Sequence, residues 1–239
     1  MVVLYLTRRC DLRCPHCQWI LRDEDFFENY DMSLTEATKI LDEYQKRYSI
    51  SSVDIAAEGE VLLYKEFENI TTHAIKRGLE VSFTTNGTLL DRYSDFLLEN
   101  LRNISISIDG YDAPTYIEHR GGTEKHYERV IDNVKNLVAK RDRGNYRSTI
   151  TVNCIIGRFN FDYIQPMIAF AEEVGIDRMR FGNYHPTDGI EEKLAPLVYG
   201  DLEVEAKYRE IIGKNDYSVN IGLPSLYGGR KTFRCTQLF

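Results

Sequence analysis

Three cysteines, Cys10, Cys14 and Cys17, lie within eight residues near the start of the chain. Thiolates are the ligands that soft metal centres prefer, and three of them in a C-x3-C-x2-C spacing can converge from one loop. Zinc in such a site would need a fourth ligand, for which Cys235, a histidine or water is available. A four-iron cluster held by three thiolates instead keeps one iron open to an outside ligand. The spacing alone therefore predicts either a structural zinc site or a reactive iron–sulfur centre.

The composition is that of a globular protein with a substantial core. The chain has 239 residues, of which 43% are hydrophobic, and this length fits one large α/β domain or a domain with an appendage. The net charge of −7 and the absence of a long Lys or Arg run argue against nucleic acid and membrane partners. Clustered cysteines without a signal-peptide pattern favour a metal site in a reducing compartment, so we expect a cytoplasmic protein.

Six apolar runs rich in β-branched residues alternate with longer amphipathic stretches. Strands that alternate with helices pair in parallel through right-handed crossovers, and six such units predict an α/β fold, a partial (β/α)6 TIM-like barrel. We expect residues 1–190 to form this barrel and residues 191–239 to form a short irregular C-terminal extension, with a helix at 201–213 and a short strand at 217–222. The six predicted strands span residues 2–6, 53–57, 80–85, 104–108, 149–156 and 178–183.

Helix ends are marked by their own residue types. Ser33 followed by Glu36 predicts a capping box at the start of the first helix, in which each side chain accepts from the other residue's backbone N–H. Gly78, Gly144 and Gly175 close three further amphipathic stretches, in the position where a helix commonly ends on glycine.

Polar motifs follow the first four predicted strands. The cysteines follow the first, "EGE" at 58–60 the second, "TNG" at 85–87 the third, and "DG" at 109–110 the fourth. In a barrel of this kind chemistry gathers at the C-terminal ends of the strands. These motifs are therefore expected to lie together around one site.

The cysteine spacing in a loop after the first strand, with these motifs in series, resembles the radical S-adenosylmethionine (SAM) superfamily over nearly the whole chain. The resemblance implies that Cys10, Cys14 and Cys17 hold a [4Fe-4S] cluster. It also implies that His16, in the slot where the family usually has an aromatic residue, lies near the adenine of SAM.

The second motif, "EGEVLL" at 58–63, resembles the family's glycine-glycine-glutamate stretch. Gly59 and Glu60 match it, whereas Glu58 and Val61 replace the usual glycine and proline. By this resemblance, Gly59 and Glu60 receive the methionyl amino group of SAM. The same resemblance includes Asn86 of the "TNG" turn among the cofactor-binding residues.

The segment "SISIDGYDAPTYIEHRGG" resembles the strand-four region of the subgroup with a SPASM or twitch extension. The resemblance implies that Ser107 contacts SAM and that Arg120 pairs with the SAM carboxylate, for which a guanidinium offers a planar fork. Asp109 is expected to shape the turn with Gly110. Asn153 is predicted to be a polar residue near SAM or substrate.

A second group of residues carries weaker predictions. Cys154 is expected to be a buried small hydrophobe. His119 and His185 follow strands on the active face and are the better histidine candidates, although a structural loop role is the simpler interpretation for both. The aromatic, acidic loop at 19–31 is expected to be either a lid or packing against the barrel.

The resemblance implies that the reduced cluster passes an electron to SAM and that a 5′-deoxyadenosyl radical then abstracts hydrogen from a substrate. An external donor such as flavodoxin or ferredoxin would supply the electron. A peptide or protein side chain is the first choice of substrate, and a small natural-product, sugar or nucleoside intermediate is the second. No catalytic residue is named. A non-catalytic zinc module and a barrel that binds SAM without cleaving it are the alternatives.

Cys235 lies close to the end of the sequence. In the related SPASM proteins a cysteine after the barrel opens a further run of cysteines that hold auxiliary clusters. One thiolate cannot hold a cluster. We therefore expect that a longer form of the protein, or a partner chain, supplies the missing ligands.

Overall fold

The structure is a computed structural model that describes residues 1–19, 30–185, 195–214 and 216–226. Its core is one seven-stranded sheet in which every pair of neighbouring strands is parallel. The strands follow the chain order without exchange, so that β1 and β7 are the edges and the barrel is open. They are β1 (Val2–Tyr5), β2 (Ser52–Ala56), β3 (Glu80–Thr85), β4 (Asn103–Ser107), β5 (Thr149–Ile156), β6 (Arg178–Asn183) and β7 (Asn220–Gly222).

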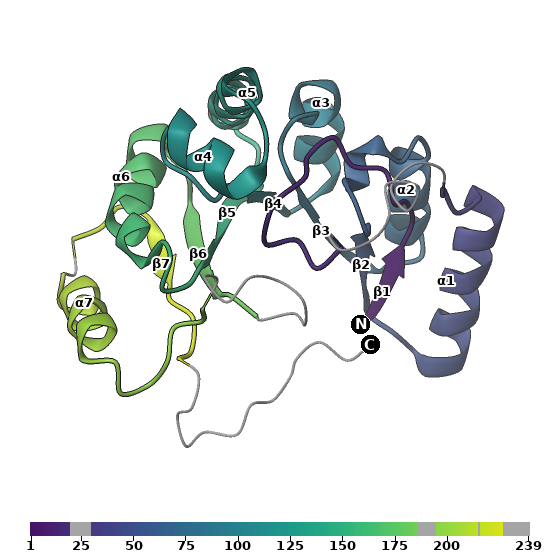
Figure 1. Cartoon of the computed structure of the whole chain (residues 1–239). Coiled ribbons are helices and arrows are strands. Elements are labelled where there is room, and N and C mark those ends of the chain that lie inside the picture. Colours follow the sequence, from purple (N-terminus) through teal and green to yellow (C-terminus); the bar gives the residue numbers. More distant parts are fainter. Residues whose placement is uncertain (20–29, 186–194, 215, 227–239) are drawn as a thin grey trace.

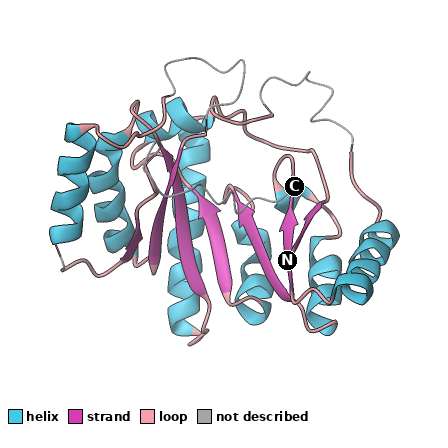
Figure 2. Cartoon of the chain, turned by 90° about the horizontal axis from the view of Figure 1, so that it is seen from below, coloured by secondary structure: helices cyan, strands magenta, loops and turns pink. Residues whose placement is uncertain are grey.

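Helices fill the crossovers between the strands. In Figure 1 the strands follow one another in an arc, and α1, α2, α3, α5 and α6 lie on its outer side. Figure 2 shows the same strands running side by side, flanked by helices. The helices are α1 (Leu34–Tyr48), α2 (Phe67–Lys76), α3 (Leu90–Asn100), α4 (Ala113–Arg120), α5 (Glu124–Arg143), α6 (Ile164–Val174) and α7 (Leu202–Gly213), with short 3-10 turns at Val61–Leu63 and Phe161–Tyr163.

The prediction of a partial TIM-like barrel is confirmed, and all six predicted strands are present. The helix and the short strand expected after residue 200 are α7 and β7. The strand β7 pairs with β6, so this part of the expected extension continues the sheet. The division at residue 190 stays a prediction. In the described part of the chain no helix has both the length and the apolar character that crossing a membrane requires.

The strands have two different faces, as their alternating residue types require. On β4, Ile104 and Ile106 are fully buried against the helices, whereas Ser105 and Ser107 point to the opposite, concave side. Similar apolar residues on the other strands join the helices in one hydrophobic core. We call the concave side of the sheet the inner face.

Helix caps agree with the sequence only in part. Ser33 Oγ accepts from the N–H of Glu36 at 3.2 Å, but the reciprocal bond of the predicted capping box is not formed. Complete capping boxes begin α4 at Asp112 and α5 at Thr123, and the sequence analysis did not name them. Gly175 ends α6 with a φ of 81°, as expected of a glycine cap.

Candidate active site

A cavity of about 460 Å3 lies at the C-terminal ends of the strands. It gathers side chains from the loops after β1, β2, β3 and β4 and from the ends of β5 and β6. All of the predicted ligand residues except Asn153 line it. The predicted residues on its wall are Cys10, Cys14, His16, Cys17, Gly59, Glu60, Asn86, Ser107 and Arg120.

The three cysteines lie on one loop and are half-buried. The loop is folded locally, since the N–H of Cys17 donates to the carbonyl of Cys14 at 3.0 Å and Arg13 Nη1 donates to the carbonyl of Cys10 at 2.9 Å. Burial raises the pKa of the Cys10 thiol to about 12 and raises that of Cys14 as well. Metal binding here must therefore release protons. Within the described residues no three His, Cys, Asp or Glu side chains lie close enough to hold a single metal ion.

Two glycines from distant motifs brace this loop. A Cβ on Gly59 would lie 2.2 Å from the carbonyl oxygen of Arg9, and a Cβ on Gly121 would lie 2.1 Å from that of Arg13. Gly121 also has a φ of 62°, which favours glycine. The bare Cα atoms thus let the backbones after β2 and after α4 pass directly against the cysteine loop.

Asp11, next to the first cysteine, ties the loop to the turn after β3. Its Oδ1 accepts from Asn86 Nδ2 at 2.7 Å, and its Oδ2 accepts from Thr88 Oγ1 at 2.6 Å. The sequence analysis missed Asp11. An acidic residue between two ligand positions was visible in the sequence, but its partners lie more than seventy positions away. Asn86 therefore holds the cysteine loop in place through its hydrogen bond to Asp11.

Glu60 is almost fully buried, and its carboxylate accepts hydrogen bonds from the turn after β3. Its Oε1 accepts from the N–H of Leu62 at 3.0 Å and from Thr85 Oγ1 at 2.6 Å, and its Oε2 accepts from the N–H of Asn86 at 2.7 Å. Desolvation by burial raises the pKa of Glu60 to about 7 despite these donors. The contact of Glu60 with the SAM amino group stays a prediction.

Asp109 has a larger role than the turn role that we expected. It is 1% exposed. Its Oδ2 accepts from Arg120 Nη1 at 2.9 Å and lies 3.4 Å from His16 Nε2, while its Oδ1 accepts from the N–H of Ile155 at 2.6 Å. Although burial opposes ionisation, the Arg120 charge and the His16 contact hold the pKa of Asp109 well below its usual range. One carboxylate thus joins the cysteine loop, α4 and β5.

The family model of the radical SAM superfamily matches residues 4–171. The chain belongs to the radical SAM superfamily. The prediction from the cysteine spacing and the following motifs is confirmed.

Curated relatives within this group are longer than this chain. The "Tungsten-containing aldehyde ferredoxin oxidoreductase cofactor-modifying protein" of Pyrococcus furiosus is 26% identical over 234 residues, which cover 94% of this chain and 63% of the relative. The "PqqA peptide cyclase" of Rhodopseudomonas palustris is 28% identical over 184 residues, covering 76% of this chain and 46% of the relative. This chain therefore spans less than two thirds of the length of either protein.

A solved structure has the same fold. Streptococcus suis SuiB, in its crystal structure with the precursor peptide SuiA, superposes with a TM-score of 0.75 at 19% identity. The match covers 95% of this chain and 49% of the SuiB chain. At this identity the likeness concerns the fold.

The pocket of this radical SAM protein fits a cluster with bound SAM. Three thiols on one loop are the donor set of a soft metal centre with an open position. Arg120 Nε is buried and has no hydrogen-bond partner among the described residues, which leaves a donor for a carboxylate. Ser107 lines the same cavity. Its register partner Asn153 lies on the same inner face but does not line the cavity.

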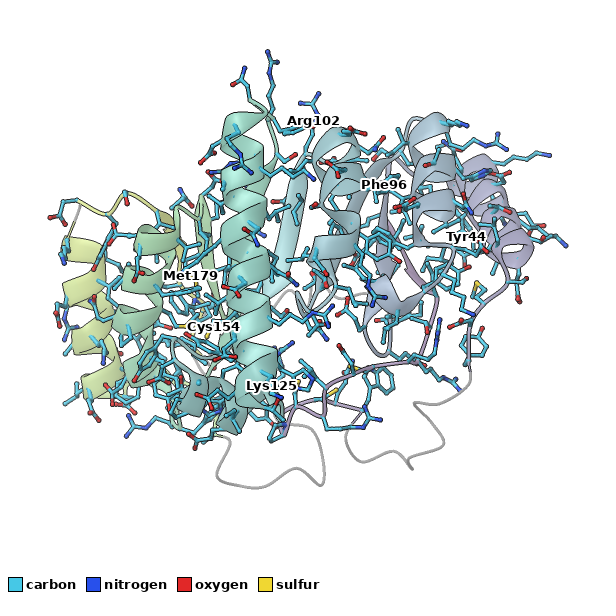
Figure 3. All side chains as sticks on the ribbon, turned by 90° about the horizontal axis from the view of Figure 1, so that it is seen from above. Tyr44, Phe96, Arg102, Lys125, Cys154 and Met179 are labelled. Atoms are coloured by element: carbon cyan, nitrogen blue, oxygen red, sulfur yellow. The ribbon has the colours of Figure 1, made fainter. Side chains whose placement is uncertain are left out.

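The remaining sequence candidates separate into three groups. Cys154 points to the helix side of β5 and is fully buried near Met179 (Figure 3), so its prediction is confirmed. His185 lines the cavity, whereas His119 is buried against Phe159 and Tyr163 with ring centroids 5.4 Å away in each case. The predicted lid, apart from its ends, and Cys235 lie outside the described residues.

Proposed function

We propose that this chain is the cluster- and SAM-binding barrel of an enzyme that starts radical chemistry on a peptide side chain. The observation that carries the proposal is the shared cavity of the three cysteines with Ser107 and Arg120. The names of the relatives support a peptide substrate, because one is a PqqA peptide cyclase and the SuiB structure holds a precursor peptide. The whole protein's reaction is part of the proposal, since the chain spans only part of these relatives.

Each group of residues has a distinct task in this proposal. Cys10, Cys14 and Cys17 would hold a [4Fe-4S] cluster, and Arg120 would bind the SAM carboxylate through its unpartnered Nε. Asp109 is a positioning residue that fixes the Arg120 guanidinium and the His16 ring. The walls of the cavity would exclude water from a reactive radical.

When bound, the cluster would supply one electron to the carbon–sulfur bond of SAM. Cleavage of this bond would yield methionine and a 5′-deoxyadenosyl radical, which would take hydrogen from the substrate. The protein's own residues contribute to this chemistry by placing the cluster, SAM and the substrate. The electron must come from outside the chain, and we propose a small cytosolic donor such as flavodoxin or ferredoxin. We also propose a SPASM or twitch-type relationship, in which further cysteines belong to a longer form or a partner.

Iron and sulfide analysis of anaerobically purified protein tests the proposal. We expect about four irons and four sulfides per chain and release of 5′-deoxyadenosine after reduction with dithionite. Cys10→Ala, Cys14→Ala and Cys17→Ala should each abolish both results. Cys154→Ala is the matched control, because Cys154 is fully buried and does not line the cavity of the three loop cysteines, and it should keep its iron.

Three outcomes would contradict the proposal. A colourless protein with a single zinc would support the non-catalytic zinc module instead. A cluster without release of 5′-deoxyadenosine would support a barrel that binds SAM without cleaving it. Full iron content in any one of the three loop variants would show that the ligands are assigned wrongly.

A further inference from the structure

The inner face of the sheet is mostly polar from β2 to β6. Residues that alternate with the buried apolar ones carry hydroxyl, amide or charged groups on every strand from β2 to β6. Several of them bond to each other across strands, as Ser82 Oγ does to Asp54 at 3.1 Å and Thr151 Oγ1 does to Asn103 at 3.0 Å. The inner face therefore suits a polar ligand rather than an apolar one.

Two arginines stand on this face at β6. Arg178 and Arg180 are exposed, whereas the alternating residues Met179 and Phe181 are buried on the helix side of the strand, where Figure 3 labels Met179. Neither arginine side chain has an ion pair or hydrogen bond with another residue of the described ranges. Eight of the other described arginines pair with an acidic side chain.

Arg180 shares a row of the sheet with residues of the predicted SAM site. Ser107, Asn153 and Arg180 are register partners on β4, β5 and β6. Neighbouring strands lie roughly 4.8 Å apart, which puts the Arg180 backbone about 10 Å from that of Ser107. Ser107 lines the cavity. A long side chain starting from Arg180 can therefore reach a ligand that extends out of the cavity along the inner face.

Glycines leave the space around Arg180 open. Gly182 is the next residue of β6 on the same face, and an added Cβ would have no atom of the described residues within 4 Å. Its register partner Ile155 lines the cavity. On the other side of Arg180, a Cβ at Gly222 would lie 3.7 Å from Arg180 Cγ. Among the described residues, β6 thus leaves an open path from the cavity to Arg180, because no side chain on the inner face of this strand stands between them.

We infer that Arg180 binds a carboxylate of the substrate, such as an acidic side chain next to the residue that is modified. The inference rests on the proposed function and adds the substrate class, an acidic peptide segment. A guanidinium binds a carboxylate through two parallel hydrogen bonds, which fix orientation as well as position. The net charge of this protein is −7, which repels an acidic segment in general. An acidic segment would therefore need a positive side chain such as that of Arg180 to hold it on the inner face.

Binding of two matched peptides to the cluster-loaded, SAM-bound protein tests the inference. The probes are acetyl-Ala-Ala-Glu-Ala-Ala-amide and its Gln isostere, and the readout is the dissociation constant from NMR line broadening of the peptide. We expect the wild type to bind the Glu peptide roughly fivefold more tightly. Arg180→Gln should reduce this ratio to about one, while Arg178→Gln, one row farther from the cavity, should keep it. Gly182→Val, which has room for its side chain, should weaken binding of both peptides by closing the path.

Several results would overturn the inference. They are equal affinity of the wild type for the two peptides, no measurable binding of either peptide at its solubility limit, or an unchanged ratio in Arg180→Gln. Arg180-dependent binding of GTP without binding of the Glu peptide would assign the residue to a phosphate instead. Release of 5′-deoxyadenosine is measured in each variant without peptide, because its loss in the wild type would refute the proposed function and not the role of Arg180.

Discussion

At the scale of single residues, the site depends on carboxylates whose partners are far away in the sequence. Asp109 contacts the cysteine loop, α4 and β5 at once, and Asp11 and Glu60 both hold the turn after β3. Asp109 and Glu60 are buried, so the loss of one of their partners leaves a buried polar group without compensation.

The first prediction concerns the buried pair of Asp109 and Arg120. Asp109→Asn keeps the shape of the side chain but leaves the Arg120 charge buried without a counter-ion, which costs roughly 3–5 kcal/mol of unfolding free energy. Urea unfolding of the apoprotein measures it, and SAM binding to the loaded protein should weaken as well. Asp112→Asn is the control, because Asn caps a helix as well as Asp does. Adding Arg120→Gln to Asp109→Asn should recover part of the stability, and no recovery would contradict the charge argument.

The second prediction is the pH dependence that Glu60 imposes on the apoprotein. Burial raises its pKa from 4.5 to about 7, so the folded state holds the proton more tightly than the unfolded chain does. The favourable contribution of Glu60 to the unfolding free energy is complete below about pH 4.5 and is lost as the pH rises through 7. The loss is roughly 3 kcal/mol. Unfolding free energies at pH 5 and pH 8 measure it. Glu60→Gln should lack this part of the pH dependence, and identical profiles for the two proteins would refute the prediction.

At the scale of elements, turns after successive strands act as braces for the cysteine loop. Gly59 and Gly121 pass against its backbone, and the turn after β3 holds Asp11. The loop itself forms no helix or strand around the three cysteines. Its shape therefore depends on the elements around it.

The third prediction compares two helix-capping glycines. Gly121 and Gly175 both have positive φ, at 62° and 81°, but a Cβ at Gly121 would lie 2.1 Å from the Arg13 carbonyl, whereas the nearest atom to one at Gly175 is a Val138 methyl carbon at 3.4 Å. Gly175→Ala should lose about 1 kcal/mol of unfolding free energy and keep its iron. Gly121→Ala should lose more stability and most of its iron, as measured by unfolding and metal analysis. Equal iron in both variants would show that the loop does not need this brace.

At the scale of the whole molecule, few backbone pairs connect the two halves of the sheet. We call the short pairing of β3 with β4 the joint. The strands β3 and β4 share only two register pairs, whereas β4 and β5 share five and β5 and β6 share six. The cavity spans this joint, with the cysteines and Glu60 on one side and Ser107 and Arg120 on the other. Ligands in the cavity therefore connect the two parts of the sheet.

The fourth prediction follows from this position of the cavity. SAM at one hundred times its dissociation constant should raise the unfolding free energy of the cluster-loaded protein by about 2.7 kcal/mol. Hydrogen exchange should slow on both sides of the joint, in β1–β3 and in β4–β6. Cys14→Ala is the control that should show neither effect. Protection confined to one side would contradict a ligand that connects both.

The sequence alone determined the family and the order of the strands, because these follow from short motifs in series and from local periodicity, whereas the cysteine ligand set stays a prediction. Val2–Tyr5 leads straight into the cysteine loop, and the alternation of isoleucine and serine in β4 identifies its two faces. The role of Asp109 was misjudged, since a turn is a local signal and its partners Arg120 and Ile155 are not. Only the tertiary structure brought Asp11 to Asn86 and placed Arg180 on the inner face without an ion pair to another described residue, because these relations depend on how parallel strands align through long crossovers.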